Sequence, residues 1–374
     1  MKICYFVNSA WYFELHWQER ALAVIEAGYD VYILARFEDD NIFERLTKKG
    51  FKCVNNFTNE YSLNPLSFLS SMFYCFKLLD EIEPDIVHSI TIKPGVMSCI
   101  WASIKKKRLV YSFVGLGRVF EGKSIVYRIL GFFVTRLYRH LFSRIKCKVL
   151  FEHKKDQDKI ISLLQIPDAI TEVIDGAGVD INFFSYKHEL NNKKTKVLFA
   201  SRMLWSKGLD TLIKVKKILQ HMDVDFDLLV AGILVENDRD AISFSQIKTW
   251  HDSGDIQWLG KRADINDVIA SVNIVALPSV YSEGIPRILL ESGAIGRPVI
   301  SFDAGGCGSL VIDGYNGYLV QKDNIEQFAE KLSLLIKNPN LRETMGRNAR
   351  NRIENGYSSE LVIQKTVKIY ESLI

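Results

Sequence analysis

Short apolar runs alternate with amphipathic segments along the whole chain. Near its start, Lys2–Val7 and Asp30–Ala35 are apolar runs of strand length, and Glu19–Ala27 between them has helical spacing. A strand, a helix and a second strand in this order form the βαβ unit of a parallel sheet. The alternation continues through the first half of the chain, with helices expected at Asn64–Glu83 and Pro94–Lys107 and strands at Asp85–His88 and Leu109–Phe113.

The second half of the chain restarts the same alternation after the polar segment Lys187–Lys196. The expected strands are Lys196–Ala200, Phe226–Ala231, Asp255–Trp258, Asn273–Leu277 and Pro298–Ser301, and the expected helices are Gly208–Gln220, Ile265–Ser271, Arg287–Ile295 and Ile325–Ile336. We therefore predict an α/β protein of two doubly wound, Rossmann-like domains. The N-terminal domain is expected at 1–187, the C-terminal domain at 188–355, and a last helix at 356–374 is expected to pack back on the N-terminal domain.

Composition agrees with two globular domains, since 48% of the 374 residues are hydrophobic and 25% are charged. A disordered or fibrous chain is thereby excluded. The six cysteines form no C-x-x-C pair, as is typical of buried thiols in a reducing compartment. The sequence has no signal-peptide pattern and no apolar stretch of about 20 residues, so we expect a cytoplasmic protein.

The segment Ser201–Gly208, with the sequence SRMLWSKG, follows the expected strand Lys196–Ala200 directly. It places Arg202 and Lys207 at the carboxyl end of a strand, beside a glycine that opens a helix. Two cations at a helix N-terminus suit a diphosphate, although a solvated basic loop would have the same residues.

The segment Ser282–Glu291, with the sequence SEGIPRILLE, places two glutamates eight positions apart. Pro286 is a favourable residue for the first turn of a helix. Gly284 has no side chain, so its backbone can approach an anion closely. Carboxylates here would accept hydrogen bonds from sugar hydroxyls. The alternative is an amphipathic helix with an ordinary surface glutamate.

Together these two segments resemble the family-4 retaining glycosyltransferases, which have the GT-B architecture of two facing Rossmann-like domains with an interdomain cleft. The resemblance covers most of residues 196–350 and includes the sequence segments LPSVYSEGIPRILLESGAIGRPVI and VIDGYNGYLV. It implies that Arg202 and Lys207 hold the diphosphate of a nucleotide-sugar donor and act in catalysis. It also implies that Glu283 acts on the donor sugar and that Glu291 binds the ribose. The N–H groups near Gly284 and Ile285 would contact phosphate.

The N-terminal half resembles a subgroup of this family that builds bacterial surface polysaccharides. The matching sequence segments are WYFELHWQERALAVIEAGYDV, SLNPLSFLSS, PDIVHSITIKPG and FVGLGRVF. In them, His88 and Lys93 are expected to face the cleft, with His88 a candidate catalytic residue, although a hydrogen-bonded histidine at a strand end is the alternative. His16, Gly115 and Gly117 are candidates for contact with the acceptor.

The sequence also departs from the family pattern. Tyr111-Ser112-Phe113-Val114 has no histidine where many relatives carry one, and Gly308 and Ser309 replace a common Arg-Glu pair. These departures leave two alternatives open: a non-catalytic scaffold that binds sugar nucleotides, and an epimerase of related fold.

Two Asp-x-Asp patterns, Asp225–Asp227 and Asp238–Asp240, could suggest a metal site. The first leads into a strand and the second lies in a polar loop. Because Arg202 and Lys207 can already neutralise a diphosphate, we expect no metal requirement and no cofactor.

Residues 91–150 contain thirteen basic residues and one acidic residue, although the net charge of the whole chain is only +4. Within this segment, 123–148 has helical spacing, with Leu130, Val134, Leu137, Leu141 and Ile145 on one stripe. Arg128, Phe132, Arg136 and Arg139 lie on the other side. Such a helix suits an anionic membrane surface, or it packs its stripe inward and leaves its arginines in solvent. No recognition motif for nucleic acid accompanies the charge.

We therefore expect a retaining glycosyltransferase that needs no metal. Its donor would be a nucleotide diphosphate sugar, with UDP-hexose or UDP-N-acetylhexosamine expected because UDP is common in the subgroup. Its acceptor would be a saccharide linked to undecaprenyl diphosphate, at the cytoplasmic face of the inner membrane.

Overall fold

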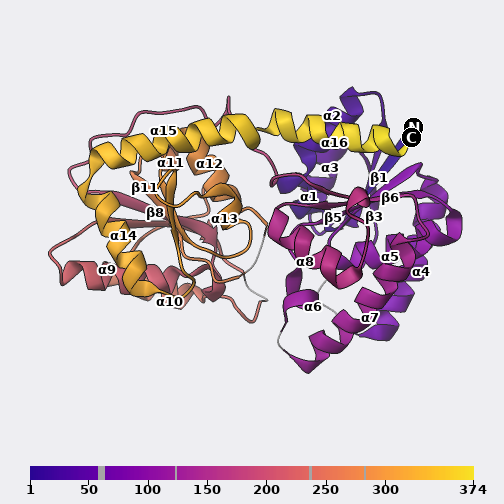
Figure 1. Cartoon of the computed structure of the whole chain (residues 1–374), viewed down its shortest axis with the longest axis horizontal. Coiled ribbons are helices and arrows are strands. Elements are labelled where there is room, and N and C mark those ends of the chain that lie inside the picture. Colours follow the sequence, from indigo (N-terminus) through magenta and orange to yellow (C-terminus); the bar gives the residue numbers. More distant parts are fainter. Residues whose placement is uncertain (58–63, 123, 236–237, 282–283) are drawn as a thin grey trace. The chain divides into compact units, whose positions relative to one another are not determined.

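The computed structural model describes residues 1–57, 64–122, 124–235, 238–281 and 284–374. The chain divides into two compact units (Figure 1). Unit 1 contains residues 1–177 and 359–374, and unit 2 contains residues 178–358. Each unit is built on one parallel sheet, so the predicted α/β fold class is confirmed.

The sheet of unit 1 has the strand order β3-β2-β1-β4-β5-β6-β7, and neighbouring strands are parallel throughout. Its strands are β1 (Lys2–Ser9), β2 (Asp30–Arg36), β3 (Lys52–Asn55), β4 (Ile86–Ile90), β5 (Arg108–Phe113), β6 (Cys147–Phe151) and β7 (Thr171–Val173). Its helices are α1 (Ala10–His16), α2 (Gln18–Glu26), α3 (Asp40–Lys48), α4 (Pro65–Ile82), α5 (Ile92–Lys105), α6 (Gly117–Glu121), α7 (Ile125–Phe142), α8 (Lys154–Leu164) and α16 (Ser359–Leu373).

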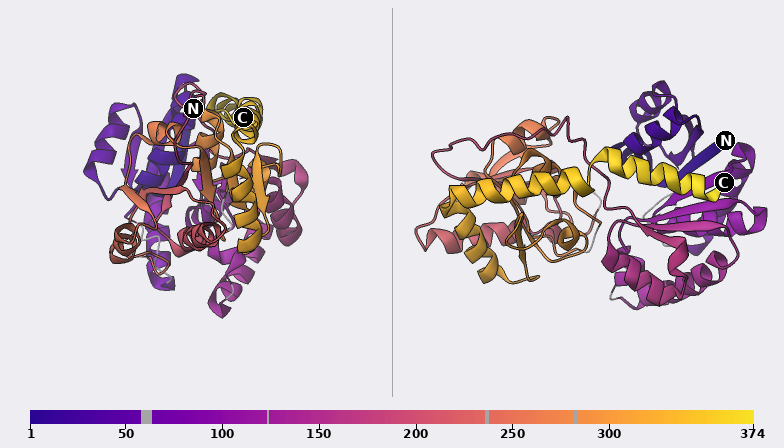
Figure 2. Two further views of the ribbon diagram at one scale, coloured as in Figure 1. Left: turned by 90° about the vertical axis from the view of Figure 1, so that its left-hand side faces the viewer. Right: turned by 45° about the horizontal axis from the view of Figure 1, so that its top comes forward.

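Two separate cores lie on the two faces of this sheet, because successive side chains of a strand point to opposite faces. In β1, Ile3 and Tyr5 join the core that contains side chains of α1, α2, α3 and α16. Cys4 and Phe6 join the core that contains side chains of α4, α5, α7 and α8. Figures 1 and 2 show the two chain termini close together in unit 1, where α16 packs beside α2.

The sheet of unit 2 has the strand order β10-β9-β8-β11-β12-β13, again with parallel neighbours. Its strands are β8 (Lys196–Arg202), β9 (Asp227–Ile233), β10 (Gln257–Gly260), β11 (Ile274–Leu277), β12 (Val299–Phe302) and β13 (Gly317–Val320). Its helices are α9 (Leu209–Gln220), α10 (Phe244–Asp252), α11 (Ile265–Ala270), α12 (Arg287–Ile295), α13 (Cys307–Leu310), α14 (Ile325–Lys337) and α15 (Pro339–Gly356).

The N-terminal segment of unit 1 ends at Ala177, before the domain boundary expected at residue 187. The intervening segment belongs to unit 2 because it is hydrogen-bonded there: Val179 N–H donates to Tyr357 O at 3.0 Å and Lys187 N–H donates to Ile295 O at 3.0 Å. The buried guanidinium of Arg297 also donates to the carbonyl oxygen of Lys187, at 2.7 Å. These partners lie far along the chain, so local composition does not reveal them.

Candidate functional site

Arg202 and Lys207 lie on one turn at the carboxyl edge of the unit 2 sheet. Arg202 is the last residue of β8 and its side chain is exposed. Lys207 ends a short 3-10 helix, Trp205–Lys207, and is only 5% exposed. Among the described residues, the guanidinium of Arg202 makes no hydrogen bond or ion pair. It is therefore available to an anion from solvent.

The turn is held in place by Gly208 and by the loop that follows β11. Gly208 has φ +82°, and a Cβ atom there would lie 2.2 Å from the carbonyl oxygen of Pro278. Val280 N–H donates to Ser206 O at 2.9 Å. Because β11 pairs with β8, the cationic turn and the 278–281 loop meet at one edge of the sheet.

Asp240 fixes the other side of this turn. Its carboxylate accepts a hydrogen bond from Ser206 N–H at 3.1 Å and another from the Ser206 hydroxyl. Trp205 N–H donates to the carbonyl oxygen of Asp240 at 2.8 Å. Asp240 thus orients the turn that carries Lys207.

Helix α12 begins after Pro286, as predicted, and carries Glu291. Glu291 is 8% exposed, and its carboxylate lies 3.2 Å from Nε of Arg287. Gly284 and Ile285 are buried against Gly306, where a Cβ atom would lie 2.7 Å from both Gly284 C and Ile285 N. Glu283 lies outside the described residues.

The first Asp-x-Asp pattern has a structural role as well. Asp225 and Asp227 both pair with Lys194, at 2.6 and 3.1 Å. The hydrogen bond from Lys194 lowers the pKa of Asp225 below its usual value. Within the described ranges, no cluster of three or more His, Cys, Asp or Glu side chains could hold a metal ion.

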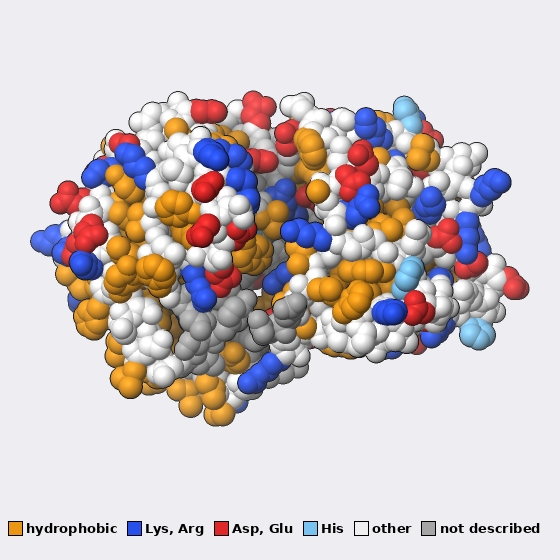
Figure 3. Space-filling view, turned by 180° about the vertical axis from the view of Figure 1, so that it is seen from behind, with side chains coloured by type: hydrophobic (Ala, Val, Ile, Leu, Met, Phe, Trp, Pro, Cys, Tyr) orange, Lys and Arg blue, Asp and Glu red, His pale blue; other side chains and the backbone are white. Residues whose placement is uncertain are grey.

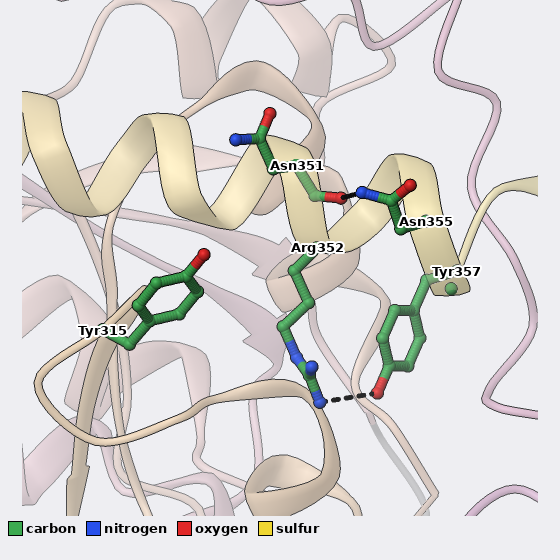
Figure 4. Close-up of a pocket in the computed structure, with 6 residues that line it drawn as sticks. Tyr315, Asn351, Arg352, Asn355 and Tyr357 are labelled. Carbon is green, nitrogen blue, oxygen red and sulfur yellow. Dashed lines mark hydrogen bonds between the residues drawn. The ribbon is translucent and has the colours of Figure 1, made fainter.

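Two cavities of unit 2 lie near these elements. One of about 280 Å³ borders the cationic turn and is lined by Trp205, Gly208 and Val280, among others. The other, of about 270 Å³, lies at the end of α15 (Figure 4). There Arg352 donates to the carbonyl oxygen of Leu310 at 2.7 Å and Tyr357 donates to that of Ser309 at 2.6 Å. Both side chains thus fasten α13 to α15, and no sequence-predicted site residue lines this second cavity.

Known glycosyltransferases match both units of the chain. The family described as "Glycosyl transferase 4-like" matches residues 2–150, and "Glycosyl transferases group 1" matches residues 180–352. An uncharacterized glycosyltransferase of Methanocaldococcus jannaschii is 31% identical over 86% of this chain and 85% of its own length. The chain belongs to the group 1 glycosyltransferases of family 4. This is a retaining family, and the predicted resemblance and enzyme class are confirmed.

Further relatives of this glycosyltransferase include an enzyme of Campylobacter jejuni, N,N'-diacetylbacillosaminyl-diphospho-undecaprenol alpha-1,3-N-acetylgalactosaminyltransferase. It is 26% identical over 90% of this chain and 89% of the relative. Among solved structures, Anabaena HepE in complex with UDP superposes with a TM-score of 0.79 at 22% identity, with all of both chains covered. The likeness to such structures shows the GT-B fold.

In unit 1 of the glycosyltransferase, His88 is a core residue, although the sequence motif predicted that it faces the cleft. It is 0% exposed, and its Nε2 lies 2.8 Å from the Ser112 hydroxyl. Its Nδ1 lies 2.5 Å from the hydroxyl of Tyr370 on α16. Burial, together with the charge of Arg20, lowers the pKa of His88 well below 6.5. Both ring nitrogens are therefore occupied by hydrogen bonds inside unit 1.

The other unit 1 candidates lie in loops and helix ends. Lys93, at the start of α5, and the turn with Gly115 and Gly117 follow the neighbouring strands β4 and β5. Gly115 and Gly117 have φ values of +114° and +60°, so glycine is required by the backbone there. His16 ends α1, is half-buried and packs against the ring of Tyr12 at 4.4 Å. The structure therefore brings Lys93 and the glycine turn to adjacent positions, with His16 on another element.

Helix α7 packs its predicted apolar stripe against the core of unit 1. Val134 and Leu141 face the core, and Phe132 is 57% exposed with Arg136 over its ring at 5.6 Å. Arg139, a candidate for the membrane surface, is exposed and donates to the carbonyl oxygens of Leu163 and Leu164, at 3.0 and 3.1 Å. It therefore caps the end of α8. No helix in the described part of the chain is long and apolar enough to cross a bilayer.

Sequence reasoning missed three residues that shape these sites. The sequence marks Asp240 only as part of an Asp-x-Asp pattern, although its carboxylate orients the cationic turn. Gly306 has a sequence signal in the Gly305–Gly306 pair, since paired glycines permit close backbone approach. Tyr370 carries no local signal, because its partner His88 is 282 positions away.

Proposed function

We propose that this glycosyltransferase transfers a sugar from a UDP-linked donor, a hexose or an N-acetylhexosamine, to a saccharide carried on undecaprenyl diphosphate. The reaction would take place at the cytoplasmic face of the inner membrane, in the synthesis of a bacterial surface polysaccharide. Two comparisons support this choice: the HepE structure contains UDP, and the Campylobacter relative is named for a diphospho-undecaprenol acceptor.

Unit 2 would bind the donor. Arg202 and Lys207 neutralise the negative charge that grows on the departing diphosphate, which is the main electrostatic demand of the transfer. Glu283 orients the donor sugar, and Glu291 accepts hydrogen bonds from the ribose hydroxyls. The backbone N–H groups of Gly284 and Ile285 donate to phosphate.

The single observation that carries this proposal is the meeting of three segments at one edge of the unit 2 sheet. Gly208 touches Pro278, Ser206 is hydrogen-bonded to Val280, and Gly306 covers the peptide at 284–285. These backbone contacts hold the turn with both cations and the start of α12 in fixed positions, which supports a preorganised site for an anion.

Transfer with retention needs no protein nucleophile in this scheme. The acceptor hydroxyl attacks the anomeric carbon on the face from which the diphosphate departs, and the leaving phosphate oxygen takes the hydroxyl proton. We place the acceptor on unit 1, near Lys93, Gly115 and Gly117, with His16 as a further contact. His88 is given no contact with the acceptor, because its ring is buried.

The test compares UDP binding and sugar transfer in Arg202→Ala, Lys207→Ala and Glu283→Ala variants. Loss of one cation is expected to lower transfer about 100-fold. In the unmodified protein, UDP at ~100 times its Kd stabilises by about 2.7 kcal/mol in a thermal shift assay, and the Arg202 variant should lose this shift. Lys217→Ala is the control, since Lys217 is 59% exposed in the last turn of α9.

Lys207 is buried, so Lys207→Ala could lower activity by disturbing the fold. Arg202 is exposed, so a loss of activity in Arg202→Ala reports on the site itself. Transfer at wild-type rates in both cation variants would overturn the assignment. Release of UDP should require the lipid-linked acceptor and should continue in EDTA. A protein that binds UDP-sugar but never releases UDP would instead be a scaffold.

A further inference from the structure

We propose that the N-terminal halves of α4 and α7 form one surface of unit 1 that inserts into a lipid bilayer. We call this surface, made of Leu66, Leu69, Phe73, Ile125, Ile129, Phe132 and Phe133, the apolar corner. It rests on the proposed function only in that a lipid-linked acceptor requires the enzyme to work at a membrane.

Helix α7 has a second apolar face that points away from the core. Ile125, Ile129, Phe132 and Phe133 follow one another at positions i, i+4, i+7 and i+8, and each is more than half exposed. The inward stripe of the same helix contains Val134, Tyr138 and Leu141. Unit 1 therefore uses one face of α7 for folding, and the other face is exposed among the described residues.

Helix α4 shows the same arrangement. Leu66 and Phe73 are 76% and 66% exposed, and Leu69, between them, is 45% exposed. Met72, Cys75 and Leu79 supply the buried face. Residues 65–76 contain no charged side chain, so this exposed face has none of the charges that normally keep a surface helix in water.

The topology brings both stripes to the same corner of unit 1. Helix α4 follows β3 and α7 follows β5, and these strands are parallel, so both helices begin near the carboxyl edge of the sheet. Both pack into the same core, with α5 between them. Figure 3 shows hydrophobic side chains gathered along the lower part of the unit at the left of that view.

Charge favours an anionic bilayer as the occupant. Arg128 and Arg136 are exposed beside the α7 stripe, and no acidic residue occurs between residues 122 and 151. Arginines can keep their heads at the level of lipid phosphates while aromatic side chains enter the acyl region. The apolar corner also lies at the sheet edge that carries the Gly115–Gly117 turn, so insertion would bring the proposed acceptor site to the bilayer.

The experiment measures cosedimentation of the full-length protein with vesicles of phosphatidylcholine and phosphatidylglycerol, at low and high salt. The variants are Leu66→Ser with Phe73→Ser on α4, and Phe132→Ser with Phe133→Ser on α7. Each pair of substitutions is expected to lower vesicle partitioning at least about tenfold. The reason is that burying two large apolar side chains in the bilayer stabilises the bound state by more than the free energy that corresponds to a factor of ten. Phe244→Ser is the matched control, since Phe244 is 56% exposed on unit 2.

Both pairs should reduce binding at high salt, where attraction of the arginines to phosphate is screened. Wild-type partitioning of both pairs, or an equal loss in the control, would overturn the proposal. A loss of self-association in place of vesicle binding would also overturn it, because the occupant would then be a second copy of the chain.

Sugar transfer to a water-soluble acceptor with a shortened lipid separates this inference from the proposed function. The four apolar-corner substitutions should leave that rate unchanged. Normal transfer together with unchanged vesicle binding would refute the membrane surface alone. Absence of transfer by the unmodified protein would refute the proposed function alone.

Discussion

The Nδ1 atom of His88 lies 2.5 Å from the hydroxyl of Tyr370, joining β4 to the C-terminal helix α16 across 282 sequence positions. Tyr370 donates its proton to the Tyr5 hydroxyl at 2.7 Å. His88 therefore donates from Nδ1 to Tyr370 and accepts at Nε2 from Ser112. All four groups are buried, so this chain of hydrogen bonds attaches α16 to the sheet of unit 1.

Replacing Tyr370 with phenylalanine should destabilise unit 1. The substitution leaves the ring in place but removes the partner of His88 Nδ1, and an unsatisfied buried donor costs about 1–3 kcal/mol. Thermal melting followed by circular dichroism measures the effect. Tyr315→Phe is the control because Tyr315 is 46% exposed, and an equal loss of stability there would contradict the assigned role.

The same cluster predicts a pH dependence of stability. Burial lowers the pKa of His88 well below its unfolded value near 6.5. As the pH falls through 6.5, the unfolded chain binds a proton that the folded chain does not. The free energy of unfolding should then decrease by about 1.4 kcal/mol per pH unit until the pH reaches the lowered pKa.

Melting temperatures at pH 7.5 and 5.5 test this contribution. The difference between the two pH values should be smaller in His88→Asn than in the unmodified protein, whereas His140→Asn, at an exposed site, should keep the full difference. An undiminished difference in His88→Asn would assign the effect to another group.

Gly208 offers a test of how the cationic turn is built. Gly208→Ala combines an unfavourable φ of +82° with a contact of 2.2 Å to Pro278 O, so the turn must move. We expect UDP binding to weaken at least tenfold, a change of about 1.4 kcal/mol. Gly254→Ala has a similar φ of +78° with nothing within 4 Å, and it should cost only about 1 kcal/mol of stability and no UDP affinity. Equal effects of the two variants on UDP binding would disprove the close-contact argument.

Asp240→Ala should weaken UDP binding without any change in metal dependence. The carboxylate holds Ser206, and its loss frees the turn that carries Lys207. Isothermal titration with UDP, in EDTA and in Mg²⁺, measures both quantities. A variant whose binding falls only in the presence of Mg²⁺ would favour a metal-ligand role for Asp240.

Arg139 and Arg128 should differ in their effects on stability. Arg139 donates two hydrogen bonds to the last carbonyls of α8, whereas Arg128 is exposed. Arg139→Ala is therefore expected to destabilise the fold by about 1 kcal/mol, and Arg128→Ala by less than about 0.5 kcal/mol. Urea unfolding at constant pH compares them, and the reverse order would refute the capping role.

Much of the fold was predictable because strands and helices follow local periodicity. The apolar runs at Lys2–Val7 and Lys196–Ala200 became β1 and β8, and the glycine at 208 opens α9 as expected. Short elements such as β3 and α13 were not predicted, since four residues carry too little periodicity. The cationic segment with Arg202 and Lys207 was found because both residues lie within one short motif beside a strand.

What the sequence by itself determined is the set of local elements, the two-sheet architecture and the chemistry carried by contiguous motifs. Only the tertiary structure decided that His88 is buried, because α16 lies far away along the chain and covers it. It also decided that the stripe of α7 with Val134 and Leu141 packs into the core, since helical periodicity alone does not say what covers an apolar stripe. The role of Asp240 also depends on a contact between separate segments, because its carboxylate binds Ser206, 34 positions away. Local residue spacing does not predict such a contact.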